Sequence, residues 1–370
     1  MRDDHAPVDA VHRSRARSPQ IGRRTLLGAG LATPFMTPAL SGCGAAEASP
    51  HRLRLGHFSN LTHGVALAGM ARGTFARHLG GTAIERQVFD NGPAAVQAML
   101  AGAIDVAYLG PNPAITAWVR TKGAGVRLLA GAAENGAALV ARPGVKKIDD
   151  LRGCSVSTPQ IGGTQDVALK TLLAEHHLTT GPGADEVETV WMANSQTLDQ
   201  FRQGRLDASY QAEPWVSRLV VEAGAHVLVD ERTQWPDHRF VTTCLLVTQE
   251  YLERAPAQVE QLLAAHVETV EWINSHRGAA SVLLNAEIGK LSGKKLKRSV
   301  AERAMDNVQF SWDPLMANIA QVAEHTWRTG GIDVRPDLRG LADLDPLRQV
   351  LAARALPAIT DAGLGVHRKG

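Results

Sequence analysis

The segment with the clearest potential for chemistry is SVSTPQIGGTQDVAL at residues 155–169, where a strand-like start gives way to a glycine-containing turn and then to a helical pattern. The first turn of a helix presents unpaired backbone N–H groups and about half a positive charge, so it attracts anions. Gly163 lets the backbone approach a ligand closely, while Thr164 and Gln165 add side-chain donors. Lys170 lies too far along the helix to clamp a phosphate. The loop therefore predicts a compact anion held by neutral donors rather than a nucleotide.

Four other segments have the same character, because each combines Gly, Pro, Asn, Gln, Ser or Thr where an expected strand gives way to a helix. They read HFSNLTHG from His57, DNGPAAV from Asp90, LGPNPAI from Leu109 and QAEPWVSR from Gln211. Ligands of open α/β sheets bind outside the carboxyl ends of the strands. The recurrence of such loops therefore predicts one shared binding site.

Each of these loops also has a purely structural interpretation. In the 155–169 segment, Thr164 or Asp166 could simply cap the helix. Asn112 could cap the helix that follows the expected strand 104–110, with Pro113 as the first residue of that helix. His63 could donate to an oxyanion or lie exposed in its loop. Trp215 could form an apolar wall for an alkyl or aryl group, or pack in the core.

No catalytic or metal-binding constellation is recognisable. The sequence contains no Gly-x-Ser-x-Gly elbow, Ser-x-x-Lys, His-Glu-x-x-His or Walker A motif. Its histidines and cysteines lack metal-ligand spacing. Cys154 and Cys244 lie in apolar strand-like runs, so we expect them to be free thiols. We therefore expect a binding protein rather than an enzyme, with no metal and no cofactor.

Short apolar strands alternate with amphipathic helical stretches after residue 50, which predicts an α/β fold with mostly parallel sheets. The expected strands are 53–58, 83–89, 104–110, 126–132, 153–158, 187–192, 206–212 and 226–231. Three residues recur at an offset of 102 positions, so that Gly102, Asp105 and Tyr108 correspond to Gly204, Asp207 and Tyr210. This internal repeat predicts two similar lobes that face each other across a cleft.

The N-terminal region has the pattern of an export signal. Arg23 and Arg24 precede a weakly apolar, Gly- and Ala-rich run that ends in Leu-Ser-Gly-Cys at Cys43. Twin arginines are typical of a Tat signal, and the final four residues are typical of a lipobox whose cysteine is lipidated. Without residues 1–42 the chain has 39 − 6 = 33 basic and 37 − 3 = 34 acidic residues. This near-neutral balance gives no indication of nucleic-acid binding.

Several of these segments resemble the nitrate/sulfonate/taurine family of ABC-transporter substrate-binding proteins, from about Leu53 to about Leu344. The resemblance is carried by VFDNGPAAVQAMLAGAIDVAYLGPNPAI, by the PQIGGTQD and EPWVSRL motifs, and by VDERTQWPDHRFVTTCLLVT. It implies a two-lobed periplasmic-binding-protein-like fold of type II, with two hinge crossings. The ligand contacts that it implies are Asn60, His63, Gly92, Gly110, Asn112, Gly163, Thr164, Gln165, Glu213 and Trp215.

The expected organisation follows from the leader, the repeat and this resemblance. Residues 1–42 form the Tat-type lipoprotein signal and 43–52 a linker from the lipidated cysteine. Residues 53–139 and 246–370 form lobe 1, and 140–245 form lobe 2.

The leader predicts a lipoprotein on the outer face of the cytoplasmic membrane, and we expect it to be a monomer. The resemblance implies that it captures a small sulfonate or related oxoanion and delivers it to an ABC permease. Two alternatives remain open: a receptor for an uncharged, pyrimidine-like heterocycle, and an enzyme similar to the thiamine-pyrimidine synthases. The second alternative requires a Cys-rich motif that Cys154 and Cys244 do not supply.

Overall fold

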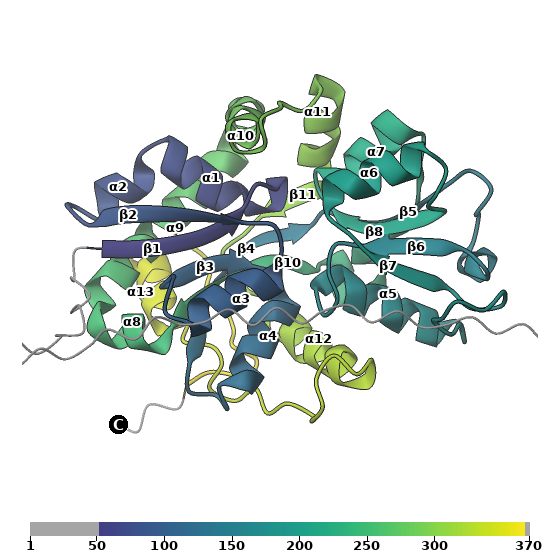
Figure 1. Ribbon diagram of the computed structural model, residues 1–370. Coiled ribbons are helices and arrows are strands. Elements are labelled where there is room, and N and C mark those ends of the chain that lie inside the picture. The colour runs from purple at the N-terminus through teal and green to yellow at the C-terminus, as the bar shows by residue number, and fades with distance from the viewer. Residues whose placement is uncertain (1–51, 367–370) are drawn as a thin grey trace, which may run out of the picture. The chain divides into compact units, whose positions relative to one another are not determined.

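The computed structural model describes residues 52–366, which belong to one compact unit. Two β-sheets, each flanked by helices, make up two lobes of this unit (Figure 1). This arrangement confirms the predicted α/β class. The expected export signal and Cys43 lie outside the described residues.

Lobe 1 contains a six-stranded sheet in the order β11-β4-β10-β3-β1-β2. Its strands are β1 (Arg52–Phe58), β2 (Ala83–Phe89), β3 (Val106–Leu109), β4 (Val126–Asn135), β10 (Val241–Thr248) and β11 (Val308–Phe310). One face is covered by helices that include α1 (Gly64–Ala71), α2 (Thr74–His78), α9 (Pro256–Ser275), α10 (Arg277–Ser292) and α13 (Asp345–Ala353). The other face is covered by α3 (Gly92–Leu100), α4 (Pro111–Arg120) and α12 (Met316–Arg328). Burial on both faces explains why β3, β4 and β10 are largely apolar, whereas the edge strand β2 is mostly exposed and polar at its centre.

Lobe 2 contains a five-stranded sheet in the order β7-β6-β8-β5-β9. Its strands are β5 (Ala137–Ala141), β6 (Ser155–Thr158), β7 (Glu188–Trp191), β8 (Ala208–Ala212) and β9 (His226–Asp230). Its helices are α5 (Thr164–Glu175), α6 (Asn194–Arg202) and α7 (Trp215–Ala223), with short 3-10 turns at η2 (Ile148–Leu151), η3 (Glu231–Gln234) and η4 (Pro236–His238). Helix α5 packs on one face of the sheet, and α6 and α7 pack on the other.

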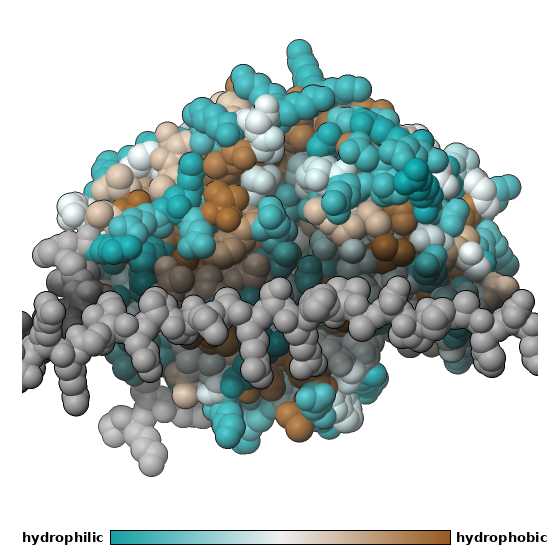
Figure 2. Space-filling model, viewed as in Figure 1, coloured by the Kyte–Doolittle hydropathy of each residue, from teal (hydrophilic) through white to brown (hydrophobic). Residues whose placement is uncertain are grey.

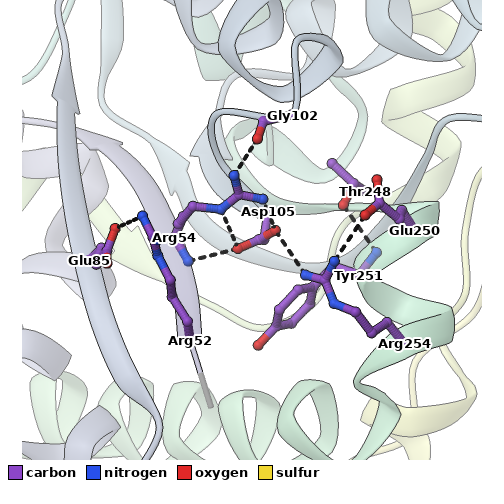
Figure 3. Close-up of polar contacts among 9 residues, drawn as sticks. All are labelled: Arg52, Arg54, Glu85, Gly102, Asp105, Thr248, Glu250, Tyr251 and Arg254. Atoms are coloured by element: carbon purple, nitrogen blue, oxygen red, sulfur yellow. Dashed lines mark hydrogen bonds and ion pairs between the residues drawn. The ribbon is translucent and has the colours of Figure 1, made fainter. Parts of the chain in front are cut away.

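The sequence repeat corresponds to a structural repeat. Asp105 precedes β3, and its Oδ2 accepts a hydrogen bond from the backbone N–H of Arg54 at 2.9 Å. Asp207 precedes β8, and its Oδ2 accepts the equivalent bond from Ser155 at 2.9 Å. In both lobes this carboxylate therefore joins the first strand of the repeat to the strand beside it. Asp105 is held further by the side chains of Arg54 and Arg254 (Figure 3).

The expectation of mostly parallel sheets is wrong in one respect. Among the described strands, four pairings are parallel and five are antiparallel. The parallel pairings belong to the repeated β-α-β units, as predicted. The antiparallel ones involve β4, β5 and β10. A strand that is reached directly from the other sheet runs antiparallel to the strands beside it. Local sequence patterns give no information about this direction.

The chain passes from lobe 1 to lobe 2 between Asn135 and Ala137, and it returns ahead of Val241. Gly136 has φ = 72°, and a Cβ at this position would lie 2.4 Å from Cγ2 of Val308, so this crossing requires glycine. The two crossings are hydrogen-bonded to each other. The N–H of Asn135 donates to the carbonyl of Phe240 at 2.8 Å, and the N–H of Phe240 donates to Oδ1 of Asn135 at 3.0 Å.

After β10 the remaining helices are α8 (Gln249–Arg254), α9, α10, α11 (Arg298–Asn307), α12 and α13. Most of them pack on lobe 1, as expected, but α11 also contacts α7 of lobe 2 and α12 contacts α5. Cys154 and Cys244 are free thiols, which confirms that prediction.

Among residues 52–366, no helix is long and apolar enough to span a membrane. The face shown in Figure 2 is mainly hydrophilic, with hydrophobic residues in smaller groups.

Candidate ligand-binding site

A cavity lies between the lobes, at the loops that follow β1, β2, β3, β6, β7 and β8, with a volume of about 590 Å³ including its opening to solvent. Seven of the ten predicted contacts line it, namely Asn60, His63, Gly92, Gly110, Gly163, Thr164 and Gln165. The other lining residues are Phe58, Thr62, Asp90, Asn91, Pro113, Pro159, Gln160, Asn194, Gln211, Ala212, Thr242 and Thr243. The structure therefore brings loops from both halves of the repeat to one place. We call this space the inner cavity.

Two helix N-termini from different lobes meet in the inner cavity. Gly110 is the N-cap of α4 and Gly163 is the N-cap of α5, and neither helix has a side-chain cap. A Cβ on Gly110 would lie only 2.4 Å from Oγ1 of Thr164, so only glycine allows the two ends to approach this closely. The first N–H groups of a helix have no partner within the helix, so the start of α5 offers several donors to a bound anion, whereas α4, with Pro111 and Pro113 in its first turn, offers the N–H of Asn112.

A buried carboxylate holds the α5 loop in shape. Asp166 is fully buried, and its Oδ2 accepts from the N–H of Gly162 at 2.9 Å and from Nζ of Lys170 at 2.8 Å. Its Oδ1 accepts from Nε1 of Trp191 at 2.7 Å. Thr164 is the first residue of α5 and does not cap it. Asp166 therefore positions the glycine loop, but α5 has no side-chain cap, so the alternative that Thr164 or Asp166 caps this helix is wrong.

His63 contributes a neutral ring to the inner cavity. It is buried, and its Nδ1 accepts from the backbone N–H of Phe58 at 3.3 Å, while its ring packs against the Phe58 ring at 4.2 Å. Burial, with the nearby His57 as the second cause, lowers the pKa of His63 well below its usual range. An imidazole that accepts through Nδ1 carries its proton on Nε2. His63 is therefore an uncharged hydrogen-bond donor.

Three buried polar atoms of the lining have no hydrogen-bond partner within residues 52–366. They are Oγ1 of Thr243, Oε1 of Gln211 and Oδ1 of Asn194. The side chains of Thr243 and Gln211 are almost completely inaccessible. An unpaired buried polar atom costs about 1–3 kcal/mol. Such atoms are typical of a site that completes its hydrogen bonds with a ligand or with water.

The inner cavity has little formal charge. No lysine or arginine lines it within the described part of the chain, and Asp90 is its only carboxylate. An anion in this site would depend on helix N-termini and neutral donors rather than on a cationic clamp.

Three predicted contacts do not line the inner cavity. Asn112 is buried in the first turn of α4 and donates from Nδ2 to Oγ1 of Thr326 at 2.8 Å. The alternative that Asn112 caps this helix is wrong, because α4 begins at Pro111 with Gly110 as its N-cap. Trp215 lies at the edge of the site, where its Nε1 donates to Oδ1 of Asn60 at 3.1 Å.

Glu213, the third of these residues, connects the lobes behind the site. It is fully buried, and it accepts from the N–H and hydroxyl of Ser217 at 3.0 and 2.9 Å. It also accepts from Nδ2 of Asn307 in lobe 1 at 2.7 Å. Burial raises the pKa of Glu213, an effect that these donors partly offset. The glutamate of the Glu-Pro-Trp segment therefore joins α7 to α11.

Three lining residues outside the predicted set come from strands and a helix start rather than from glycine-containing loops. Gln211 and Thr243 belong to strands β8 and β10, where alternation gives no indication that a polar side chain faces a ligand. Asn194 begins α6 and reads as an ordinary helix start. Within residues 52–366, no group of three His, Cys, Asp or Glu residues could hold a metal ion.

Two α/β lobes joined by two crossing segments around a polar cavity are the fold of periplasmic binding proteins. The chain belongs to the NMT1-like family, which matches residues 46–285.

Proteins similar to this chain are named as binding proteins. A putative binding protein of Brucella abortus (strain 2308) is 24% identical over 334 residues, which cover 89% of this chain and 98% of that protein. The taurine-binding periplasmic protein of Escherichia coli (strain K12) is 30% identical over 172 residues, covering 46% of this chain and 51% of that protein. The structure of the alkanesulfonate-binding protein SsuA from Xanthomonas axonopodis pv. citri, bound to MOPS, has a TM-score of 0.62 and 19% identity over 78% of this chain and 96% of that one.

Proposed function

We propose that this protein is the solute-binding component of an ABC importer and that it captures a small sulfonate or related oxoanion in the inner cavity. The observation that carries this proposal is the meeting of two uncapped helix N-termini, at Gly110 and Gly163, beside buried polar atoms without partners. The names of the taurine- and alkanesulfonate-binding relatives support the same ligand class.

The ligand contacts in this proposal come from both lobes. Asn60, His63, Gly92 and Gly110 act from lobe 1, and Gly163, Thr164 and Gln165 act from lobe 2. Because only the closed arrangement makes both sets of contacts, ligand binding favours closure. A permease could then distinguish the closed, occupied form from the open one. The receptor would act as a monomer and without a cofactor.

The proposal places the protein outside the cytoplasm. The twin arginines export the chain, and lipid on Cys43 anchors it to the outer face of the cytoplasmic membrane. Membrane fractionation of wild type and Cys43→Ala tests this part. The wild type should sediment with membranes and the variant should be released. Equal partitioning of both would contradict the lipid anchor.

A second candidate function is reception of an uncharged heterocycle. It is favoured by the lack of lysine and arginine in the lining of the inner cavity among the described residues. An enzymatic role has less support, since we find no nucleophile with an adjacent base in this cavity. Its histidine, His63, is buried and neutral.

Thermal unfolding of the full-length protein with candidate ligands separates these functions. The panel contains alkanesulfonates, taurine, nitrate, bicarbonate and neutral pyrimidines. A ligand that binds only the folded state at a hundredfold excess over its Kd stabilises it by about 2.7 kcal/mol. Stabilisation by a sulfonate supports the proposal, whereas stabilisation by neutral rings alone would replace it with the second candidate.

A further inference from the structure

A second cavity lies between α5 of lobe 2 and α12 of lobe 1, two helices that contact each other across the lobe boundary (Figure 1). Its volume is about 520 Å³ including its opening to solvent. Within residues 52–366, Thr164 is the only residue that lines both this cavity and the inner cavity. A molecule in the second space, which we call the α5–α12 cavity, would therefore meet a different set of side chains.

One face of α5 forms a wall of the α5–α12 cavity. Its residues recur at helical spacing and therefore share a face, namely Thr164, Val167, Ala168, Thr171, Leu172 and Glu175. Oγ1 of Thr171 is buried and has no hydrogen-bond partner in the described part of the chain. This wall is thus apolar in its middle, with one unpaired hydroxyl, and it ends in a carboxylate.

A second wall is aromatic. Trp235 and Phe240 belong to the segment that returns to lobe 1, and their ring centroids are 4.9 Å apart. The ring of Trp235 also packs against that of His325 on α12, at 5.6 Å between centroids. Burial lowers the pKa of His325, so its ring is uncharged at neutral pH. Aromatic faces attract both apolar groups and cations.

The charge of the α5–α12 cavity is negative. Two carboxylates line it, and no lysine or arginine does so within residues 52–366. Glu231 is buried, and its carboxylate accepts from Nε1 of Trp235 at 2.8 Å and from the hydroxyl of Tyr210. Burial raises the pKa of Glu231 to about 7, and the charge of the nearby Glu175 acts in the same direction. Because the two carboxylates repel each other, a cation between them would be stabilised.

We infer that the α5–α12 cavity is a second ligand site, which binds a small organic cation that carries an aromatic ring. The ring packs between the apolar face of α5 and Trp235, and the ammonium group lies near Glu175. This site goes beyond the proposed function, because it uses neither the inner cavity nor a sulfonate.

Four probes separate the effect of charge from that of the ring. They are 2-phenylethylammonium, 2-phenylethanol, 3-phenylpropionate and butylammonium, and isothermal titration calorimetry at low salt and neutral pH measures their affinities for the full-length protein. We expect 2-phenylethylammonium to bind about fivefold more tightly than 2-phenylethanol, because an ion pair and an aromatic face both favour the ammonium. 3-Phenylpropionate should bind more weakly than 2-phenylethanol. Butylammonium should bind about tenfold more weakly than 2-phenylethylammonium, since it buries less apolar surface.

Two variants place the cation in the α5–α12 cavity. Glu175→Gln changes an exposed side chain, and it should reduce the preference for the ammonium over the alcohol to less than about twofold. Thr171→Phe should weaken all three ring-bearing probes by about tenfold or more, because the added ring occupies the space that they need. Circular dichroism checks that this second variant is folded.

Two further variants are matched controls. Asp90→Asn removes the carboxylate that lines the inner cavity, so it should leave the preference for the ammonium unchanged. Glu260→Gln, an exposed change on α9 outside both cavities, should do the same.

Each result decides for or against the second site. Equal affinities of the cation, the alcohol and the carboxylate would overturn the inference about charge, and equal affinities of 2-phenylethylammonium and butylammonium would overturn that about the ring. A preference that survives Glu175→Gln but disappears in Asp90→Asn would assign the cation to the inner cavity and overturn the second site, as would the absence of binding by any probe. These results leave the proposed function intact, since the sulfonate panel tests it separately.

Discussion

The indole Nε1 of Trp215 in lobe 2 donates a hydrogen bond to the amide Oδ1 of Asn60 in lobe 1, at 3.1 Å. This contact joins the two lobes at the edge of the inner cavity, which Asn60 lines. It fixes the orientation of an amide that lines the inner cavity, and it belongs to the arrangement in which the lobes are close together.

Trp215→Phe should weaken ligand binding by about fivefold, because it removes a hydrogen bond worth about 1 kcal/mol from the closed arrangement. An aromatic ring remains at this position, so its apolar contacts are largely preserved. Calorimetric titration with the best ligand of the panel measures the change. Trp327→Phe is the control, since this tryptophan lies on α12 and does not line the inner cavity. Unchanged affinity in Trp215→Phe would show that the bond does not contribute to closure.

Gly110→Ala should weaken binding by tenfold or more. The added Cβ would meet Oγ1 of Thr164 at 2.4 Å, so the helix ends of α4 and α5 would have to separate. The free energy of unfolding should change much less than the free energy of ligand binding, because the contact lies between the lobes and not within either core. Gly278→Ala is the matched control, since nothing lies within 4 Å of its Cβ position. Wild-type affinity in Gly110→Ala would mean that ligand binding does not require this approach.

Asp166→Asn should lower both stability and affinity. The neutral amide cannot accept all three hydrogen bonds of the buried carboxylate, and it leaves Lys170 without its ion-pair partner. We expect a loss of about 1–3 kcal/mol in the free energy of unfolding, measured by urea denaturation. Asp185→Asn, an exposed change, should leave this free energy within about 0.5 kcal/mol of wild type. A stable Asp166→Asn with normal affinity would show that the loop holds its shape without the carboxylate.

Stability should fall as the solution is acidified from pH 7 to pH 4. Burial lowers the pKa of His57 and of His266 to about 4, and it lowers that of His63 well below 6.5. Below about pH 6.5 the unfolded chain therefore binds protons that the folded protein does not, which favours unfolding until the folded pKa is reached. A shift of this size corresponds to at most about 3 kcal/mol for each histidine. Chemical denaturation across this pH range measures the slope, and a flat profile would contradict neutral histidines in the core.

Glu231 has the opposite effect on how stability depends on pH. Burial raises its pKa to about 7, so the folded protein takes up this proton more readily than the unfolded chain does. Its destabilising effect is fully present above pH 7 and disappears as the pH falls toward 4.5. Glu231→Gln should therefore stabilise the protein at pH 8 and make the decline toward pH 4 steeper. Reduced stability of this variant at pH 8 would show that the ionised carboxylate is favoured in the fold.

The parts of the fold that could be predicted from the sequence are those with a local signal. Strand β2 was predicted with its observed bounds, because glycine-containing turn segments limit it on both sides. The offset of 102 residues identified Asp105 and Asp207, although only the structure shows that both accept the N–H of a neighbouring strand. The direction of β10 could not be predicted, because it depends on how the chain returns to the first sheet.

The candidate site shows the same division between local and distant contacts. Glycine loops at helix starts were visible in the sequence, and they do line the inner cavity. Glu213 stands in such a loop, yet its side chain faces Asn307, which lies 94 positions further along the chain. A partner so distant leaves no trace in local spacing. Polar residues within buried strands, such as Thr243, were missed for a similar reason: only the packing of both lobes shows which strand positions face the cavity.

The mutual hydrogen bonds between Asn135 and Phe240 limit how the two lobes can move. Since the outgoing and returning strands are tied to each other at the boundary, neither can slide past the other while the bonds persist. The two lobes can still bend relative to each other about a single hinge axis. Opening then reduces to one coordinate, so a single distance between a probe on each lobe would follow the whole motion.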